Sequence, residues 1–166
     1  RFENPAKFIK QMKVGKKTLH LPSRNQFYEL VKSVRAVNKR FSNDAAALIE
    51  FLAYGGFRKN EAANITWADC DFERGKIILK GDPETGLKAR SVGEHRDVPM
   101  ISEMRRFLEQ LKAKRPNESA TAKVMCVAEC NGALASACRR LEIPHITHHD
   151  LRHLFATTCI ESGVDI

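Results

Sequence analysis

The stretch THHDLRH at residues 147–153 places several ionisable side chains at the start of one expected helix. Thr147 is a favourable N-cap residue, and Asp150, three positions later, completes the capping-box pattern. We therefore expect a helix that begins directly after Thr147 and runs to Gly163.

Two side chains of this helix, His149 and Arg152, lie three positions apart and therefore on one face of its first turns. They stand beside unpaired backbone N–H groups, at the positive end of the helix dipole. A site of this kind attracts phosphate. Taken alone, a surface helix with a solvated histidine and arginine explains the stretch as well.

A second motif lies upstream, in GFRKNEAANITWAD at residues 56–69, which contains G-x-R-x-x-E followed by W-x-D. Together with H-x-x-R-H about ninety residues later, it resembles the tyrosine recombinase (phage integrase) family. That family carries G-x-R-x-x-E-x-x-x-L-x-W-x-D early in its catalytic domain and HDLRH-x-F-A-T late. The resemblance implies an α+β fold, mainly α-helical with a small three-stranded antiparallel sheet, as in the DNA breaking-rejoining enzymes.

The length of the chain, 166 residues with 43% hydrophobic content, suits one domain with one buried core and is too short for two ordinary domains. The resemblance implies that residues 21–166 are a catalytic domain that ends before its C-terminal part. Residues 1–20 are expected to be a basic linker from an N-terminal DNA-binding domain that this chain lacks.

Positive charge is concentrated near the N-terminus. Residues 1–40 hold 11 Lys and Arg against 2 Asp and Glu, whereas the remaining 126 residues hold 17 against 18. No apolar stripe of the membrane-binding type accompanies this charge, so a nucleic acid is the expected partner and a solvated linker is the alternative. The side chains expected to contact double-stranded DNA are Lys10, Lys13, Lys16, Lys17, Lys80 and Arg96.

Five cysteines at irregular spacing argue against a disulfide framework and indicate a reducing compartment. The sequence shows no signal peptide and no span of about 18 apolar residues. We therefore expect a soluble, intracellular protein. The resemblance implies that it is of bacterial or phage origin, cytoplasmic and nucleoid-associated.

A zinc-binding site is a competing interpretation, since two cysteines are followed by histidines. The interval between them is too long for a zinc finger and a proline interrupts it, so we expect neither a metal nor a cofactor. The residues of this alternative are Cys126, Cys130, His145 and either His148 or His149.

Helix caps and β-propensity predict the remaining elements. Helices are expected after caps at Ser23, at Asn43 or Asp44 and at Ser102, together with a short one after Arg58 and another over residues 131–141. Strands are expected after Trp67, over residues 76–80 and over residues 95–100.

Arg58 and Arg152 suit phosphate binding because a guanidinium engages two phosphate oxygens and keeps its proton. The resemblance implies that both arginines contact the phosphate that is cleaved. It also implies that His149 acts there as a hydrogen-bond donor or as a general acid and base. Glu61, three residues beyond Arg58, is expected to orient a neighbouring side chain rather than to take part in the chemistry.

The resemblance further implies a lysine, on the turn between the second and third strands, as the general acid for the leaving 5′ oxygen. Lys88 precedes the segment 96–99, RDVP, which resembles the R-x-V-P strand of the family, and it is the preferred candidate. Lys80, at the end of the preceding strand, is the alternative, because the loop is longer than the usual pattern.

Family members continue beyond H-x-x-R and carry the nucleophilic tyrosine there. The only tyrosines here, Tyr28 and Tyr54, lie on expected helices among Phe and Leu residues, so both are expected to pack rather than to react. We expect the complete protein to be a site-specific recombinase that cleaves and rejoins DNA through a 3′-phosphotyrosyl intermediate, in a homotetramer on DNA. This fragment is then inactive. A non-catalytic DNA-binding or regulatory module is the alternative.

Overall fold

The computed structural model describes residues 19–80 and 95–161. Several expectations concern residues outside these ranges, namely the basic linker, the end of the last helix and the lysine preferred as general acid. The side chains concerned are Lys10, Lys13, Lys16, Lys17 and Lys88.

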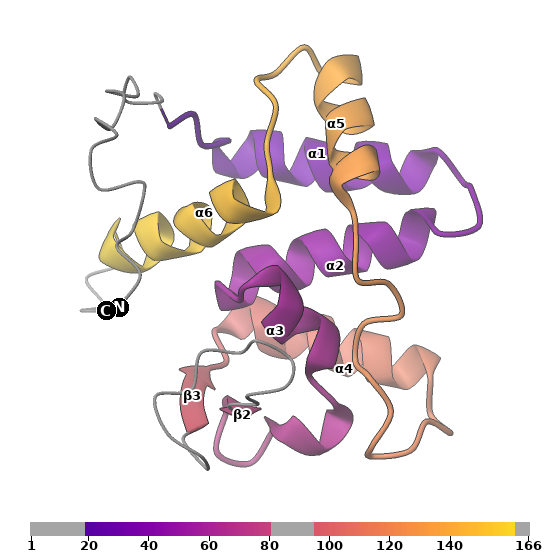
Figure 1. Ribbon diagram of the computed structural model, residues 1–166, viewed down its shortest axis with the longest axis vertical. Helices are drawn as coiled ribbons and strands as arrows, with labels where there is room; N and C mark the ends of the chain where they lie inside the picture. The colour runs from indigo at the N-terminus through magenta and orange to yellow at the C-terminus, as the bar shows by residue number, and fades with distance from the viewer. Residues whose placement is uncertain (1–18, 81–94, 162–166) are drawn as a thin grey trace, which may run out of the picture.

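Helix α2 (Ser42–Gly55) lies at the centre of the molecule (Figure 1). Its apolar residues are buried on all sides, as expected for a helix that other elements surround. Helix α1 (Arg24–Ala36) packs along it through one apolar stripe. The stripe is the one that the sequence predicts, and its members are Phe27, Leu30, Val31 and Val34.

Four further helices each contact α2. They are α3 (Lys59–Asn64), α4 (Ser102–Lys114), α5 (Asn131–Arg140) and α6 (His148–Glu161). A 3-10 turn at Trp67–Asp69 joins α3 to the sheet. Since α3 carries part of the G-x-R-x-x-E motif and α6 carries the H-x-x-R-H motif, one central helix supports both motifs (Figure 1).

The sheet has three antiparallel strands in the order β1-β2-β3. Strand β1 (Cys70–Asp71) is short, and the turn before β2 (Lys76–Lys80) contains Gly75 with a φ of 64°. Strand β3 (His95–Pro99) then pairs with β2. The predicted fold class, mainly helical with a small three-stranded antiparallel sheet, is confirmed.

Two of the predicted helix caps are wrong. Neither Asn43 nor Asp44 caps α2, which begins at Ser42. The Ser42 hydroxyl instead accepts a hydrogen bond from the Lys39 N–H, 2.9 Å away, in the preceding turn. Ser102 is the first residue of α4 and its hydroxyl donates to Glu103, so that helix also starts without a side-chain cap. The predicted capping box at Ser23 is confirmed.

All five cysteines are free thiols, in line with the expectation of no disulfide framework. Within residues 19–80 and 95–161, no helix is long and apolar enough to cross a membrane.

Candidate active site

Arg58 stands at the junction of α2 and α3. Gly56 ends α2 with a φ of 59°, and the extended Arg58 that follows begins α3 as its N-cap residue. Glu61 then folds back onto it. One carboxylate oxygen accepts from the Arg58 backbone N–H at 2.8 Å, and the other accepts from the Arg58 guanidinium at 2.7 Å. The spacing of three residues in G-x-R-x-x-E thus lets one carboxylate bind both the backbone N–H and the guanidinium of Arg58.

Glu61 also binds a second arginine. The Arg96 guanidinium, from β3, donates to the same carboxylate at 3.1 Å. Burial by itself would raise the pKa of Glu61, but the hydrogen bonds from Arg58 and the charge of Arg96 outweigh it and lower that pKa. The carboxylate is therefore charged, and it is buried with only 8% of its side chain exposed.

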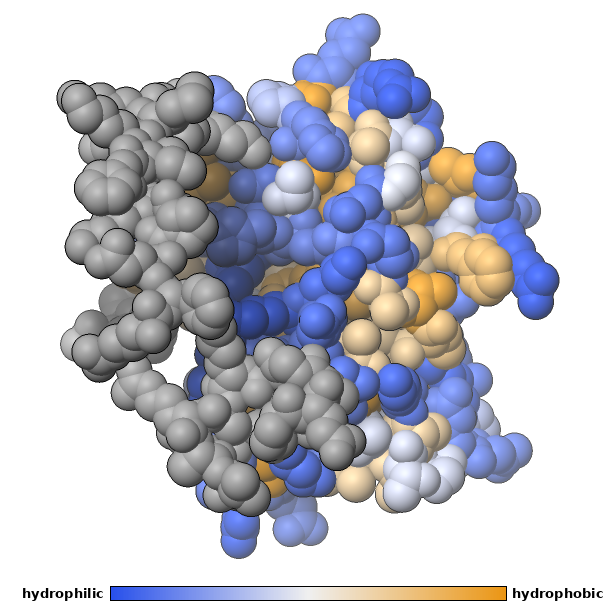
Figure 2. Space-filling model, viewed as in Figure 1, coloured by the Kyte–Doolittle hydropathy of each residue, from blue (hydrophilic) through white to orange (hydrophobic). Residues whose placement is uncertain are grey.

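Both guanidinium groups remain accessible above this buried carboxylate. The Arg58 side chain is 57% exposed and that of Arg96 is 48% exposed. Figure 2 shows hydrophilic side chains gathered on this face of the molecule, over α3 and the start of α6. Glu61 can therefore hold two arginines in place without covering their outward-facing N–H groups.

Arg152 joins the H-x-x-R-H motif to the G-x-R-x-x-E motif. Its guanidinium, on α6, donates to the backbone carbonyl of Gly56, directly before the Arg58 segment. Burial lowers the pKa of Arg152, and the positive charges of Arg58 and Arg96 lower it further. Three guanidinium groups thus share one region with one carboxylate, which leaves an excess of positive charge suited to phosphate.

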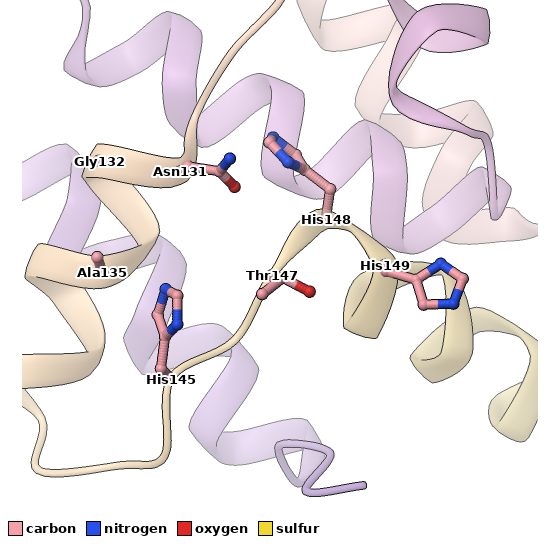
Figure 3. A pocket seen from close by; sticks show the side chains of 7 residues that line it. All are labelled: Asn131, Gly132, Ala135, His145, Thr147, His148 and His149. Carbon is pink, nitrogen blue, oxygen red and sulfur yellow. The ribbon is translucent and has the colours of Figure 1, made fainter. Parts of the chain in front are cut away.

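The start of α6 is held by the predicted capping box. The Asp150 carboxylate accepts from the Thr147 N–H at 2.8 Å and from the Thr147 hydroxyl at 2.7 Å. His149 is exposed on the first turn, and its ring lies edge-on to the ring of His153 with centroids 4.4 Å apart. In Figure 3 the His148 and His149 rings point in different directions, so the two side chains face different parts of the molecule.

Lys80 forms an ion pair with Asp69, the aspartate of the W-x-D motif. Its ammonium group lies 2.5 Å from a carboxylate oxygen of Asp69, whose side chain is only 9% exposed. The other Asp69 oxygen accepts from the Thr66 N–H and hydroxyl at 2.9 and 2.6 Å. Although burial would raise the pKa of Asp69, Lys80 and Thr66 together lower it. Lys80 thus stabilises a buried charge.

A cluster beside the site contains Lys59, Glu129, Cys130 and His148. Sequence reasoning grouped Cys130 with His148 only as possible zinc ligands and missed Lys59 and Glu129. The His148 Nε2 atom lies 3.2 Å from the Cys130 sulfur and 3.2 Å from a carboxylate oxygen of Glu129. The other Glu129 oxygen accepts from the Lys59 ammonium at 2.9 Å. Two signals were available in the sequence: the grouping of Cys130 with His148 in the zinc alternative, and the positions of Lys59 and His148 directly beside motif residues.

An open pocket of about 570 Å³ adjoins this cluster (Figure 3). It is lined by Asn131, Gly132, Ala135, His145, Thr147, His148 and His149.

The structure gives the zinc interpretation no support. Across the described ranges, no group of three or more His, Cys, Asp or Glu side chains is arranged to hold a metal ion. Cys126 is exposed whereas Cys130 is buried, and burial raises the pKa of Cys130 to about 12.

The two tyrosines differ. Tyr54 packs edge-on against Phe27 and Phe107, with ring centroids 5.9 and 6.3 Å away, and burial raises its pKa to about 12. Its phenol is therefore a poor nucleophile, as expected. Tyr28 is 43% exposed, so the prediction that it packs among its Phe and Leu neighbours is wrong. Its position on the outer side of α1 explains the exposure.

The family model described as "Phage integrase family" matches residues 21–166. The chain therefore belongs to the phage integrase family. It is 29% identical over 183 aligned positions to the tyrosine recombinase XerA of Thermococcus kodakarensis, covering all of this chain and 58% of that protein. It is 25% identical to the tyrosine recombinase XerD of Neisseria meningitidis serogroup A, again covering all of this chain and 58% of that protein.

A solved structure shows the same fold. The Tn1549 transposon integrase, in complex with transposon right-end DNA, matches with a TM-score of 0.69 and 16% identity, over 93% of this chain and 57% of that one. This chain thus spans somewhat more than half the length of the relatives it matches.

Gly56→Ala is expected to destabilise the fold by about 1–3 kcal/mol. The backbone φ of 59° disfavours any side chain, and an added Cβ would lie 2.3 Å from the Phe155 ring of α6. Urea unfolding followed by circular dichroism measures the change. Gly132→Ala is the control, since nothing lies within 4 Å of its added Cβ. Equal stability of the two variants would contradict the close approach of α6 to Gly56.

Proposed function

We propose that this chain is the phosphate-binding part of a tyrosine recombinase that cleaves and rejoins DNA through a 3′-phosphotyrosyl intermediate. The observation that carries the proposal is the convergence of Arg58 and Arg96 on the buried Glu61 carboxylate, with a third guanidinium, that of Arg152, bonded to the Gly56 carbonyl and within electrostatic range of all three. The family relationship and the fold shared with a DNA-bound integrase support it.

In the proposed reaction, Arg58 and Arg152 bind the non-bridging oxygens of the scissile phosphate. Their charge stabilises the additional negative charge of the transition state, because preorganised donors need no rearrangement when that charge develops. His149, exposed at the start of α6, donates a hydrogen bond to the same phosphate. Glu61 acts below them by holding Arg58 and Arg96 in position.

The proposed nucleophile is a tyrosine supplied by another part of the protein, because Tyr54 is packed against Phe27 and Phe107, and Tyr28 lies beside Arg24 on α1, which carries neither motif. The covalent bond to that tyrosine conserves the energy of the broken phosphodiester, so rejoining needs no nucleotide. Residues 1–20 and the exposed Lys and Arg side chains would bind the flanking phosphates. Recombination would take place between DNA duplexes held by a tetramer of the complete protein.

Covalent trapping tests this function. A duplex that contains the crossover site, nicked beside the scissile phosphate, is incubated with the protein expressed from its complete reading frame. A DNA adduct that survives denaturing gel electrophoresis is expected, whereas residues 1–166 alone are expected to form none. DNA binding by the complete protein without an adduct would favour the non-catalytic DNA-binding alternative. An adduct of residues 1–166 at Tyr28 or Tyr54 would contradict the assigned site.

A further inference from the structure

Glu129 occupies a position where three elements meet. Its side chain precedes α5 and accepts hydrogen bonds from the first backbone N–H groups of that region, of Cys130 at 2.9 Å and of Asn131 at 2.8 Å. The N-terminus of α5 is thus already neutralised by a carboxylate of this chain, which argues against an external anion there. Glu129 serves an internal purpose instead.

The same carboxylate links the two sequence motifs. Oε2 accepts from the ammonium group of Lys59, the residue directly after Arg58, at 2.9 Å. Oε1 lies 3.2 Å from Nε2 of His148, the residue directly before His149. One side chain therefore contacts the neighbour of an active-site arginine and the neighbour of the active-site histidine.

We propose that Glu129 is a positioning residue that sets the distance between the Arg58 segment of α3 and the His149 segment of α6 through Lys59 and His148. This inference rests on the proposed function, in which Arg58 and His149 bind the same phosphate. It adds a residue that lies outside both motifs and touches neither the phosphate nor the nucleophile.

Three features make the link suited to this role. The Lys59 ammonium group lowers the pKa of Glu129 to about 2, so the carboxylate is charged at any working pH. Its two hydrogen bonds to the start of α5 restrict its orientation. The buried Cys130 thiol lies 3.2 Å from the same nitrogen of His148, Nε2, and is its second neighbour. A carboxylate held by several partners at once is ordered more than one in an isolated pair, and Glu129 contacts Lys59, His148 and two backbone N–H groups.

The expected effect is on rate more than on stability. Ion pairs with exposed partners contribute little to the free energy of unfolding, and the side chains of Lys59 and Glu129 are 43% and 52% exposed. A displacement of about 1 Å between groups that bind one transition state, however, slows a reaction by up to about 100-fold.

Single-turnover cleavage of the nicked duplex by the protein from its complete reading frame tests the role. Glu129→Gln keeps a carbonyl oxygen for the α5 N–H groups but loses the charge, and it should slow cleavage about tenfold with DNA affinity changed less than about twofold. Lys59→Gln should slow cleavage to a similar extent when the protein is saturating, so that any loss of DNA affinity does not enter the rate. The double variant should be no slower than the slower single variant, because both changes break one link.

The matched control is Glu109→Gln. Glu109 is 56% exposed and pairs with Arg105 within α4, so its substitution removes a similar surface charge away from the motifs. Its cleavage rate should equal that of the unchanged protein. Rates of Glu129→Gln within about twofold of the control, or effects of Glu129→Gln and Lys59→Gln that multiply in the double variant, would overturn the proposal.

A second measurement is independent of cleavage. The pKa of His148 is lowered by burial and raised by the charge of Glu129, so Glu129→Gln should lower it further in an NMR titration of residues 1–166. The His148 signal is assigned by its loss in His148→Gln. An unchanged pKa would show that the link does not exist. If the unchanged complete protein fails to cleave DNA, the proposed function fails and the role of Glu129 in cleavage with it, while the titration still reports on the contact.

Discussion

Arg152→Ala is expected to slow DNA cleavage by the complete protein about 10²–10³-fold, which corresponds to about 3–4 kcal/mol of transition-state stabilisation. The Arg152 guanidinium is half-buried and donates a hydrogen bond to the Gly56 carbonyl. The positive charges of Arg58 and Arg96 are near enough to lower its pKa. Its orientation is therefore set before DNA binds. Arg58→Ala should have a loss of the same order, because its guanidinium is likewise held in advance by Glu61.

Arg152→Lys separates charge from geometry. The lysine keeps the positive charge but lacks the two parallel N–H donors of arginine. The cleavage rate of this variant should therefore remain well below that of the unchanged protein. The matched control is Arg105→Ala. Arg105 also donates to a backbone carbonyl, that of Phe72 at 2.6 Å, and it contacts neither motif. Its loss should change stability without a comparable loss of cleavage.

Rates are measured in single-turnover reactions at saturating protein, with urea unfolding of each variant as the measure of stability. If Arg105→Ala and Arg152→Ala lost cleavage equally, the Arg152 effect would be a loss of folding rather than of phosphate binding. If Arg152→Lys retained full activity, bidentate binding of the phosphate would be the wrong description.

Lys88→Ala is expected to slow cleavage about 10²–10⁴-fold with nearly unchanged DNA affinity, because a general acid acts in the transition state. Lys88 lies outside the described residues, so the structural argument for it rests on the contacts of the alternative candidate, Lys80. Lys80 is paired with the buried Asp69 carboxylate at 2.5 Å, and donating its proton would leave that carboxylate without a counter-charge. Lys80→Ala should therefore lower stability and affect cleavage far less.

A substrate with a bridging 5′-phosphorothiolate distinguishes proton donation from other effects. Its sulfur leaves without protonation, so it should restore cleavage by Lys88→Ala. It should not restore Arg58→Ala or Arg152→Ala, which lose stabilisation of the non-bridging oxygens. Restoration of Lys80→Ala instead would show that the loop has been aligned in the wrong register. If neither lysine variant responds, the acid lies elsewhere, and His149 is the next residue to substitute.

The helix starts show which local features could be predicted from sequence. The Thr147–Asp150 and Ser23–Gln26 capping boxes formed as predicted, because each needs only residues three positions apart on one turn. The predicted caps at Ser102 and at Asn43 or Asp44 did not form. A polar side chain near a helix start can bind elsewhere, and the sequence does not say which partner it takes.

The sequence by itself determined the family, the mainly helical fold with its small sheet, and the capping boxes at Thr147 and Ser23, since motif spacing and short-range hydrogen bonds carry that information. Only the tertiary structure decided which distant groups meet. Arg152 binds the Gly56 carbonyl, 96 positions away, and Arg96 binds Glu61, 35 positions away. Glu129 joins Lys59 to His148. These contacts depend on how α3, α5 and α6 pack around α2, because packing fixes distances between residues that chain connectivity leaves free.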